Sequence, residues 1–309
     1  MDFALGGIAA MGACLFTNPL EVVKTRMQLQ GELHARGSHA IHYKNFAHAF
    51  ITIAKTDGVL ALQNGLVPAL WFQLFLNGFR LGTYQICDTH GLTKDKNGNS
   101  SVIRSMAIGA LGGAIGASSG SPFYLIKTQL QSKAAAQIAV GHQHSHENMT
   151  SALYKIFKQS GIIGLYRGVS SAIPRAAVGS SVQLVTFAKS KEILRDNNIL
   201  NDSPLMISFV ASMMGGTLMS LAMTPFDVIA TRLYNQGLDA HGRPLLYNGI
   251  LDCIYKMCKT EGIYGFYKGF WPSYLRLGPH TVLVLVFWDQ IKLVQKAFQT
   301  TTSDMEENI

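Results

Sequence analysis

Acidic and basic side chains follow three prolines at a repeated spacing. Pro19 is followed by Glu21 and Lys24, and two related stretches begin at Pro122 and Pro225, so that successive prolines are 103 residues apart. Glu21 and Lys24 lie on nearly one face of a helix because they are three residues apart. If three such helices form a ring, the acid of one helix can pair with the base of the next. This spacing predicts ion pairs that close one end of a pore.

The three prolines themselves have a predicted structural role. A proline inside a membrane helix removes a backbone hydrogen bond and kinks the helix. Kinks at Pro19, Pro122 and Pro225 would draw the adjoining helix halves toward a common axis, where the charges of the motif meet.

Three arginines, Arg80, Arg175 and Arg276, lie within apolar stretches. An arginine near the centre of a membrane costs about 2.5 kcal/mol or more, so its side chain normally faces water or a partner. The planar guanidinium binds carboxylate and phosphate groups through two parallel hydrogen bonds. Arg175 and Arg276 stand at equivalent positions of different segments, which predicts a site that holds the two ends of a small dianion. The alternative is that each arginine packs against carbonyls or extends to the membrane surface.

A second repeated motif indicates that the chain is built from three copies of one unit. The stretches DGVLALQNG, SGIIGLYRG and EGIYGFYKG end at Gly65, Gly168 and Gly269, each at a similar distance after a motif proline. Two linked motifs that recur at one period predict a triplicated unit of about a hundred residues. We expect one domain, 1–309, made of three repeats at about 1–98, 99–201 and 202–309.

Two apolar stretches in each unit are long enough to cross about 30 Å of hydrocarbon as helices. They cover 3–23, 66–87, 104–126, 168–188, 206–229 and 269–291. A short amphipathic pattern lies between the two stretches of each unit, which predicts short helices outside the membrane. The sequence therefore predicts an all-α membrane protein with six transmembrane helices. An even number places both termini on one side, and the excess of Lys and Arg in the long loops places those loops on the more negative side.

The composition agrees with a membrane protein. Of 309 residues, 48% are hydrophobic and only 14% are charged, whereas soluble domains carry about 25% charged residues. The thirty glycines, dense within 109–120, suit closely packed membrane helices. The net charge of +8 suits an anionic partner, and nucleic acid is excluded because no basic patch is interleaved with aromatic residues.

Other reactive side chains fit no catalytic or metal site. The four cysteines form no CxxC pair, which indicates a reducing compartment or a membrane interior. His142, His144 and His146 alternate in one loop without an acidic or cysteine cluster, so no metal site is predicted. No nucleophile–base pair or nucleotide-binding loop is present, so the protein is not expected to be an enzyme. The N-terminus has no cleavable presequence pattern, so any organelle address is expected to be internal.

The proline motif resembles the signature of the mitochondrial carrier family, Px[DE]xx[KR], in all three repeats. Its details look closest to the subfamily of solute carrier family 25 member 35 and the fungal oxaloacetate carrier. The resemblance implies a six-helix bundle with pseudo-threefold symmetry and short matrix helices. It also implies a central substrate site and alternating access to the matrix and the intermembrane space. We expect a multi-pass monomer in the inner mitochondrial membrane, with both termini toward the intermembrane space.

The resemblance implies a gate on the matrix side in which each acid pairs with the base of the next repeat. Glu21 would pair with Lys127, and Asp227 with Lys24. The second repeat has Tyr124 in place of an acid and the third has Ala230 in place of a base, and these two positions would meet each other. Because an unpaired buried charge is costly, we expect a matrix gate of two ion pairs with no stranded charge.

The family's second gate, [FY][DE]xx[KR] on the cytoplasmic side, is poorly matched. Only WDQIK fits, with Asp289 and Lys292, while Lys191 retains a base and Gln85 replaces an acid. We expect this gate to be weak, which would permit some uniport beside exchange.

The family's substrate-contact positions lie about two turns into the second helix of each repeat. Counting seven residues from the second-motif glycine gives Phe72, Arg175 and Arg276, and helical spacing extends this face. His280 is expected to be a polar wall residue, with a proton relay as the alternative. The remaining candidates on this face are Gln73, Arg80 and Gln183.

Glycines that precede helix starts are similar to the cardiolipin-binding pattern of the family, because exposed helix N-termini bind phosphate through backbone N–H groups. Cardiolipin is therefore expected as a structural lipid, and no other cofactor is expected. The candidate lipid-binding positions are Gly58, Gly161, Gly168, Gly262 and Gly269.

These features predict a secondary transporter, typically an antiporter, of small organic anions. Oxaloacetate- or malate-like dicarboxylates, keto acids and phosphoenolpyruvate-like acids are the candidate substrates. The alternative is a scaffold or receptor on the carrier fold that transports nothing.

Overall fold

The computed structural model describes residues 2–34, 41–93, 101–196, 204–239, 242–276 and 278–280, together with residues 283, 286–287 and 290–291. Helices are the regular elements of the described chain, and the β-type contact within it is one isolated bridge between Leu238 and Pro244. The prediction of an all-α fold is confirmed.

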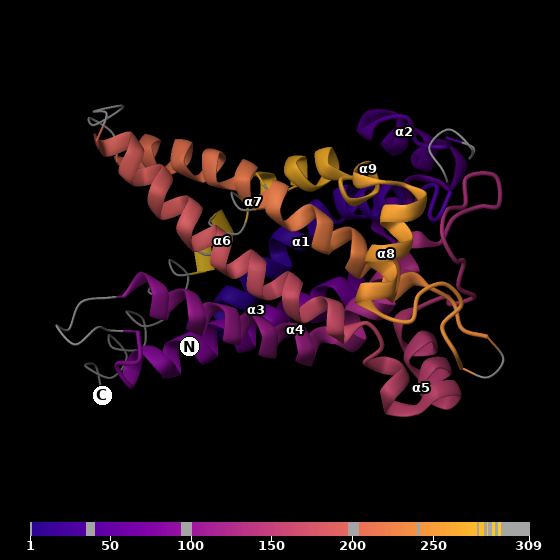
Figure 1. Ribbon diagram of the computed structural model, residues 1–309, viewed down its shortest axis with the longest axis horizontal. Helices are drawn as coiled ribbons and strands as arrows, with labels where there is room; N and C mark the ends of the chain where they lie inside the picture. Colours follow the sequence, from indigo (N-terminus) through magenta and orange to yellow (C-terminus); the bar gives the residue numbers. More distant parts are fainter. Residues whose placement is uncertain are drawn as a thin grey trace, which may run out of the picture.

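Five long helices run along the length of the molecule (Figure 1). They are α1 (Asp2–Leu29), α3 (Leu66–Thr89), α4 (Val102–Ser132), α6 (Val169–Asp196) and α7 (Pro204–Asn235). At 1.5 Å per residue, helices of this length extend about 36–48 Å, which exceeds the thickness of a bilayer core. In the sixth predicted segment, residues 270–276 and 278–280 are helical. By length and hydropathy alone, one described stretch, Val59–Thr89, qualifies as a candidate membrane span.

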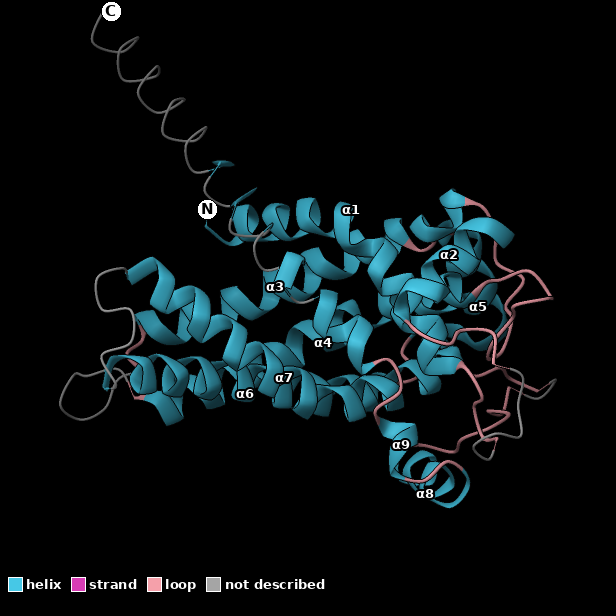
Figure 2. Cartoon of the chain, turned by 90° about the horizontal axis from the view of Figure 1, so that it is seen from above, coloured by secondary structure: helices cyan, strands magenta, loops and turns pink. Residues whose placement is uncertain are grey.

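Short helices gather at one end of the long ones, opposite the start of α1 (Figures 1 and 2). The side chains of Asn45 and Asn148 accept backbone hydrogen bonds at the starts of α2 and α5 and so cap these helices. The set consists of α2 (Phe46–Thr56), η1 (Val59–Gln63), α5 (Met149–Leu165), α8 (Ile250–Thr260) and α9 (Ile263–Phe266).

The first helix of each repeat is longer than predicted. α1, α4 and α7 each continue six residues past the apolar ends expected at 23, 126 and 229. The added turns carry polar side chains that are buried because they bond to other helices. The Thr25 hydroxyl donates to Gln131 Oε1 at 2.9 Å, and the Thr231 hydroxyl donates to Gln28 Oε1 at 2.8 Å. A prediction based on hydropathy therefore places the end of each helix too early. Pro19, Pro122 and Pro225 lie inside α1, α4 and α7, which continue as helix on both sides.

The predicted close packing of the glycine-rich helix is confirmed at the contact between α4 and α3. Gly112, Gly116 and Gly120 are four residues apart and face α3. A Cβ atom at Gly116 would lie 2.5 Å from the backbone oxygen of Leu76, so no larger side chain fits without separating the helices.

The second-motif glycine of each repeat meets the first helix of the next repeat in cyclic order. All three glycines have positive φ, and a Cβ added to any of them would lie about 3 Å from the neighbouring helix. The pairs are Gly65 with Lys127 of α4, Gly168 with Tyr234 of α7, and Gly269 with Gln28 of α1. Equivalent contacts at three interfaces are what pseudo-threefold symmetry requires.

Candidate functional site

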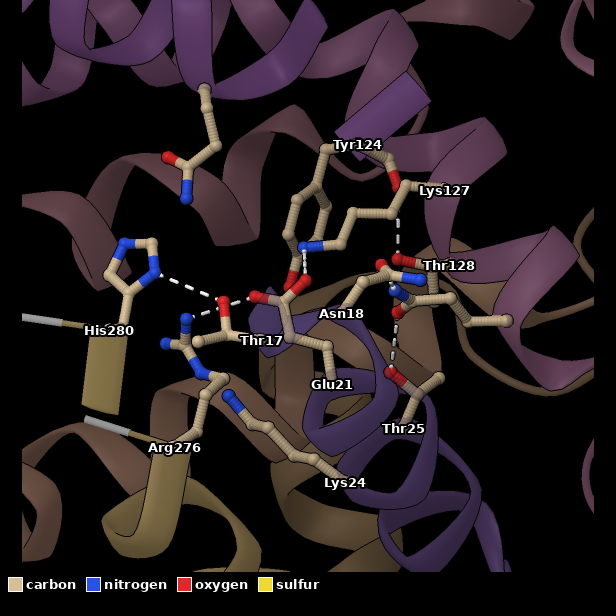
Figure 3. Close-up of polar contacts among 12 residues, drawn as sticks. Thr17, Asn18, Glu21, Lys24, Thr25, Tyr124, Lys127, Thr128, Arg276 and His280 are labelled. Atoms are coloured by element: carbon tan, nitrogen blue, oxygen red, sulfur yellow. Dashed lines mark hydrogen bonds and ion pairs between the residues drawn. The ribbon is translucent and has the colours of Figure 1, made fainter. Parts of the chain in front are cut away.

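The carboxylate of Glu21 in α1 is shared by two cations (Figure 3). Lys127 of α4 contacts one of its oxygens, and Nη1 of Arg276 lies 3.0 Å from the other. The motif that follows Pro19 places Glu21 on the inner side of α1, while Arg276 reaches it from the last repeat. A predicted gate residue and a predicted substrate residue are therefore in one ion cluster.

The carboxylate of Asp227 in α7 repeats this arrangement. Lys24 of α1 donates from Nζ to Oδ2 at 2.6 Å, and Arg175 of α6 donates from Nη1 to Oδ1 at 3.2 Å. The contacts of Glu21 with Lys127 and of Asp227 with Lys24 are the two pairs that the motif indicated. The contacts of both arginines with these acids were not expected from the sequence.

The two clusters carry an uncompensated positive charge. They contain four cations, Lys24, Lys127, Arg175 and Arg276, against two carboxylates, so their formal net charge is +2. Between 7% and 20% of each of these side chains is exposed. Buried charge is tolerated only with nearby compensation, so this part of the bundle favours a ligand with two negative charges.

The third interface of the ring is neutral. Phe72 stands at the position that the arginines hold in the other repeats, and Tyr124 stands at the position of the acids; their ring centroids are 4.9 Å apart. The ring centroids of Tyr124 and Tyr234 are 4.8 Å apart, and Ala230 packs in the same hydrophobic cluster. An aromatic contact thus replaces an acid–arginine contact at this interface.

The Tyr124 ring also stabilises the neighbouring cations. The guanidinium carbon of Arg175 lies 5.1 Å from the ring centroid and Lys127 Nζ lies 5.6 Å from it, both within cation–π range.

Both arginines have donors to spare. Each uses one terminal nitrogen on an acid, and the Nε atoms of Arg175 and Arg276 are buried without a hydrogen-bond partner in the described part of the chain. A buried unpaired donor is unfavourable by about 1–3 kcal/mol. An oxygen-rich ligand would satisfy these groups.

His280 lies beside this cluster (Figure 3). Its Nδ1 is 3.1 Å from the hydroxyl oxygen of Thr17, and that hydroxyl is itself 3.0 Å from the Ala13 carbonyl. The Thr17 hydroxyl can therefore donate to Ala13 and accept from His280 Nδ1. This contact fixes the ring and leaves Nε2 as an acceptor.

The other predicted substrate residues are more scattered. Gln73 is buried in α3, and its Oε1 accepts from Asn77 Nδ2 at 3.3 Å, which leaves its NH2 group as a donor. Arg80 lies eight residues beyond Phe72 in α3, about 12 Å along the axis. Among the described residues, it forms no ion pair with either cluster. The side chain of Gln183 in α6 lies outside the described part of the structure.

The predicted cytoplasmic gate falls mostly outside the described residues. Asp289 and Lys292 are not described, and only the backbone of Lys191 is, within α6. Gln85 is exposed in α3. The role of this gate stays a prediction.

The candidate lipid glycines have positive φ values, which glycine adopts more readily than other residues. Gly58, Gly161 and Gly262 have φ values of 87°, 62° and 66°, and nothing lies within 4 Å of a Cβ added to them. They begin or interrupt the short helices η1, α5 and α9. Gly168 and Gly269, also at positive φ, stand just before the second long helix of their repeats. Lipid binding at these positions stays a prediction.

The sequence reading missed a layer of polar residues nine positions after each motif proline. Gln28 and Gln131 accept from threonines of α7 and α1, and the Tyr234 hydroxyl lies 2.8 Å from that of Ser121. The sequence period could have revealed this layer, because Gln28, Gln131 and Tyr234 are separated by the same 103 residues as the motif prolines.

A further layer of ion pairs, also missed, joins the long helices to the short ones. Arg26 of α1 pairs with Asp57 at 2.6 Å, and Arg232 of α7 pairs with Glu261 at 2.5 Å. Lys268 also contacts Glu261, at 2.6 Å. Burial alone would raise the pKa of Glu261, but the hydrogen bonds and charges of Arg232 and Lys268 outweigh it and lower the pKa. Among the described residues, no group of three or more histidines, cysteines and acids is arranged to hold a metal.

Comparison with known proteins places this site in a family context. The chain matches the family model described as mitochondrial carrier protein over residues 1–95, 98–198 and 201–298. It is 53% identical to solute carrier family 25 member 35 of Homo sapiens, over 94% of this chain and 97% of that protein. It is 40% identical to the mitochondrial oxaloacetate transport protein of Saccharomyces cerevisiae, over 95% and 89% of the two chains. It is 37% identical to mitochondrial citrate transporter E of Aspergillus niger, over 99% and 98%.

Proposed function

Because the chain belongs to the mitochondrial carrier protein family, whose members are transporters of the inner mitochondrial membrane, we propose that it carries small organic dianions by alternating access. The candidate substrates are oxaloacetate- or malate-like dicarboxylates, keto acids and phosphoenolpyruvate-like acids. The names of the relatives from Saccharomyces cerevisiae and Aspergillus niger, which refer to oxaloacetate and citrate, support the carboxylic acid class.

The observation that carries this proposal is the net charge of +2 on the paired clusters of Glu21 and Asp227. Arg175 and Arg276 each keep a buried Nε without a partner in the described chain, so each can bind one carboxylate of the substrate. A dianion would neutralise the excess charge. Phe72 offers no charge at the third equivalent position, which disfavours a third carboxylate.

The shared acids suggest how binding is coupled to opening. A substrate that takes over Arg175 and Arg276 competes with Asp227 and Glu21 for the same donors. Each acid would then lose one of its two cations, which weakens the contacts that hold the helices together at the end where the short helices lie. In this proposal that end faces the matrix, the termini face the intermembrane space, and exchange of two anions is the principal mode.

Cardiolipin is the proposed structural lipid, bound at the open glycine turns that include Gly58, Gly161 and Gly262. These turns suit a phosphate group because no side chain covers the backbone and each precedes a helical turn. All residues of the two clusters and of the neutral interface come from one chain. A monomer is therefore sufficient for transport in this proposal.

Uptake of labelled malate into proteoliposomes loaded with unlabelled anion tests the proposal. We expect Arg276→Ala and Arg175→Ala to lower the initial rate by tenfold or more, because each removes one carboxylate contact. Arg276→Lys should also be impaired, since lysine keeps the charge but loses the planar fork. Arg243→Gln, which changes an exposed arginine outside the clusters, is the matched control and should keep the wild-type rate.

Two outcomes would contradict the proposal. Uptake by both alanine variants within twofold of wild type would show that the arginines do not bind the substrate. No uptake of any anion in a panel of dicarboxylates, keto acids and phosphorylated acids by correctly folded wild-type protein would favour the scaffold alternative.

A further inference from the structure

The three repeats differ in the ion-pair layer that joins long and short helices. In the first and third repeats, an arginine seven residues after the motif proline pairs with an acid: Arg26 with Asp57, and Arg232 with Glu261. The equivalent positions of the second repeat are Gln129 and Ser160. Both charges of this pair are therefore missing from the second repeat.

The second repeat nevertheless has a cation, Arg167, at the position equivalent to Lys268 of the third repeat. In the third repeat, Lys268 donates to the Gln30 carbonyl at 2.8 Å and to the Glu261 carboxylate at 2.6 Å. Arg167 is its equivalent, and it donates from Nη2 to the Gln236 carbonyl at 2.9 Å. Ser160 stands at the repeat position of Glu261, so the carboxylate that Lys268 contacts has no counterpart at this position of the second repeat. Its Nε is buried and has no hydrogen-bond partner in the described chain.

A cavity of about 410 Å³ lies at this place. It is formed between α5, the histidine loop and the segment that follows α7. Among the described residues of its lining, the one carboxylate belongs to Asp239, whose Oδ1 accepts from the Arg243 backbone. Cationic and polar side chains dominate the rest of the lining, namely Gln129, Lys155, Ser160, Arg167 and the histidines at 142, 144 and 146.

The histidines supply further nitrogen atoms that have no hydrogen-bond partner in the described chain. His146 is only 8% exposed, and its Nδ1 is buried without a partner among the described residues, as is Nδ1 of His142. His144 donates from Nε2 to the Asn235 carbonyl at 2.8 Å. Two histidines and one arginine therefore bring to the cavity nitrogen atoms that no other described residue pairs with.

We propose that this cavity binds a small soluble dianion, a phosphate or a dicarboxylate, whose oxygens occupy the place of the carboxylate that the second repeat lacks. Arg167 and Lys155 supply charge, and the histidine nitrogens supply hydrogen bonds. The site is separate from the clusters of Glu21 and Asp227, because it lies among the short helices and their loops.

The electrostatics of the cavity agree with this proposal. Burial lowers the pKa of His144 to about 4, and burial together with nearby cations lowers the pKa values of His142 and His146. Near neutral pH these rings are uncharged, and burial also lowers the pKa of Arg167. A bound dianion would oppose these shifts because it favours the charged form of each group.

The test uses the purified full chain in detergent, free of lipid, with inorganic phosphate as the probe and thermal unfolding as the measurement. All variants carry Arg276→Ala, which weakens anion binding at the other site. We expect 20 mM phosphate to raise the melting temperature of this background by about 3 °C or more. Ser160→Glu supplies an internal carboxylate at the position of Glu261. It should raise the melting temperature without phosphate and reduce the phosphate effect to less than about 1 °C.

Two further variants keep the result interpretable. Ser160→Ala changes the same position without adding charge and should keep the phosphate effect, whereas Arg167→Gln should lose it. The proposal is overturned if phosphate stabilises the Ser160→Glu variant as much as its background, or stabilises neither. It is also overturned if Ser160→Glu lowers the melting temperature without phosphate.

Phosphate groups are also present in lipid headgroups, so a second arm adds cardiolipin in place of phosphate. If the site takes a soluble anion, Ser160→Glu leaves the stabilisation by cardiolipin unchanged. If Ser160→Glu abolishes the cardiolipin effect but not the phosphate effect, the cavity is a headgroup site and the assignment to a soluble anion is wrong.

Discussion

Replacing Asp227 with asparagine would leave two buried cations without their shared carboxylate. Lys24 Nζ lies 2.6 Å and Arg175 Nη1 lies 3.2 Å from its oxygens. At an effective dielectric constant of about 20, these contacts correspond to attractions of about 6 and about 5 kcal/mol before desolvation is subtracted. The three side chains are 8–14% exposed, so solvent screens them little. Breaking a buried pair typically destabilises by about 3–5 kcal/mol.

For a domain of this size, that loss corresponds to a fall in melting temperature of about 6–10 °C. Thermal unfolding can be followed with a thiol-reactive dye, because Cys14 and Cys253 are buried in the folded protein. Adding Lys24→Met to Asp227→Asn removes one of the stranded cations and should recover about half of the loss.

Asp252→Asn is the matched control, since Asp252 pairs with Lys256 at 2.7 Å on the surface. It should change the melting temperature by less than about 1 °C, because surface ion pairs contribute little. The reasoning is refuted if Asp227→Asn melts within 1 °C of wild type. It is refuted equally if Lys24→Met adds its own full loss to that of Asp227→Asn.

Two other substitutions test the packing of the helices and the neutral interface. Gly116→Ala should destabilise the protein by about 1–3 kcal/mol, because the new methyl would lie 2.5 Å from the Leu76 oxygen; thermal unfolding should show the loss, while Gly278→Ala, with nothing within 4 Å, should be neutral. Phe72→Arg places a third guanidinium level with the other two and should raise the ratio of citrate to malate uptake in proteoliposomes by tenfold or more. An unchanged ratio would mean that Phe72 does not contact the substrate.

Much of the fold was predictable because it is repeated. The period of 103 residues and the lengths of the apolar stretches were enough to predict an all-helical bundle built from repeated units. The ends of α1, α4 and α7 were not predictable from hydropathy. Their last turns carry residues such as Thr25, Gln28 and Gln131, whose burial depends on partners in other repeats.

The site was predictable in its composition but not in all its contacts. The rule that each acid meets the base of the next repeat gave the contacts of Glu21 with Lys127 and of Asp227 with Lys24. The sequence placed Arg175 and Arg276 at one level, but it did not indicate that each reaches an acid of the next repeat. That contact depends on how close neighbouring helices approach, which is set by packing and not by spacing within one helix.

The two ion clusters give α1 a special place in the bundle. Glu21 connects this helix to α4, and Lys24 connects it to α7, so every lysine–carboxylate bond of the ring has one end on α1. α4 and α7 meet instead through Tyr124, Tyr234 and neighbouring apolar groups. An anion that binds the cations of the clusters weakens the charged contacts, whereas the aromatic contact carries no charge for it to compete with. Removal of the charged contacts would therefore loosen α1, which would keep hydrogen bonds such as Thr25–Gln131 and Thr231–Gln28, while α4 and α7 stay joined by their aromatic contact. This end of the bundle would then open mainly beside α1 rather than equally at all three interfaces.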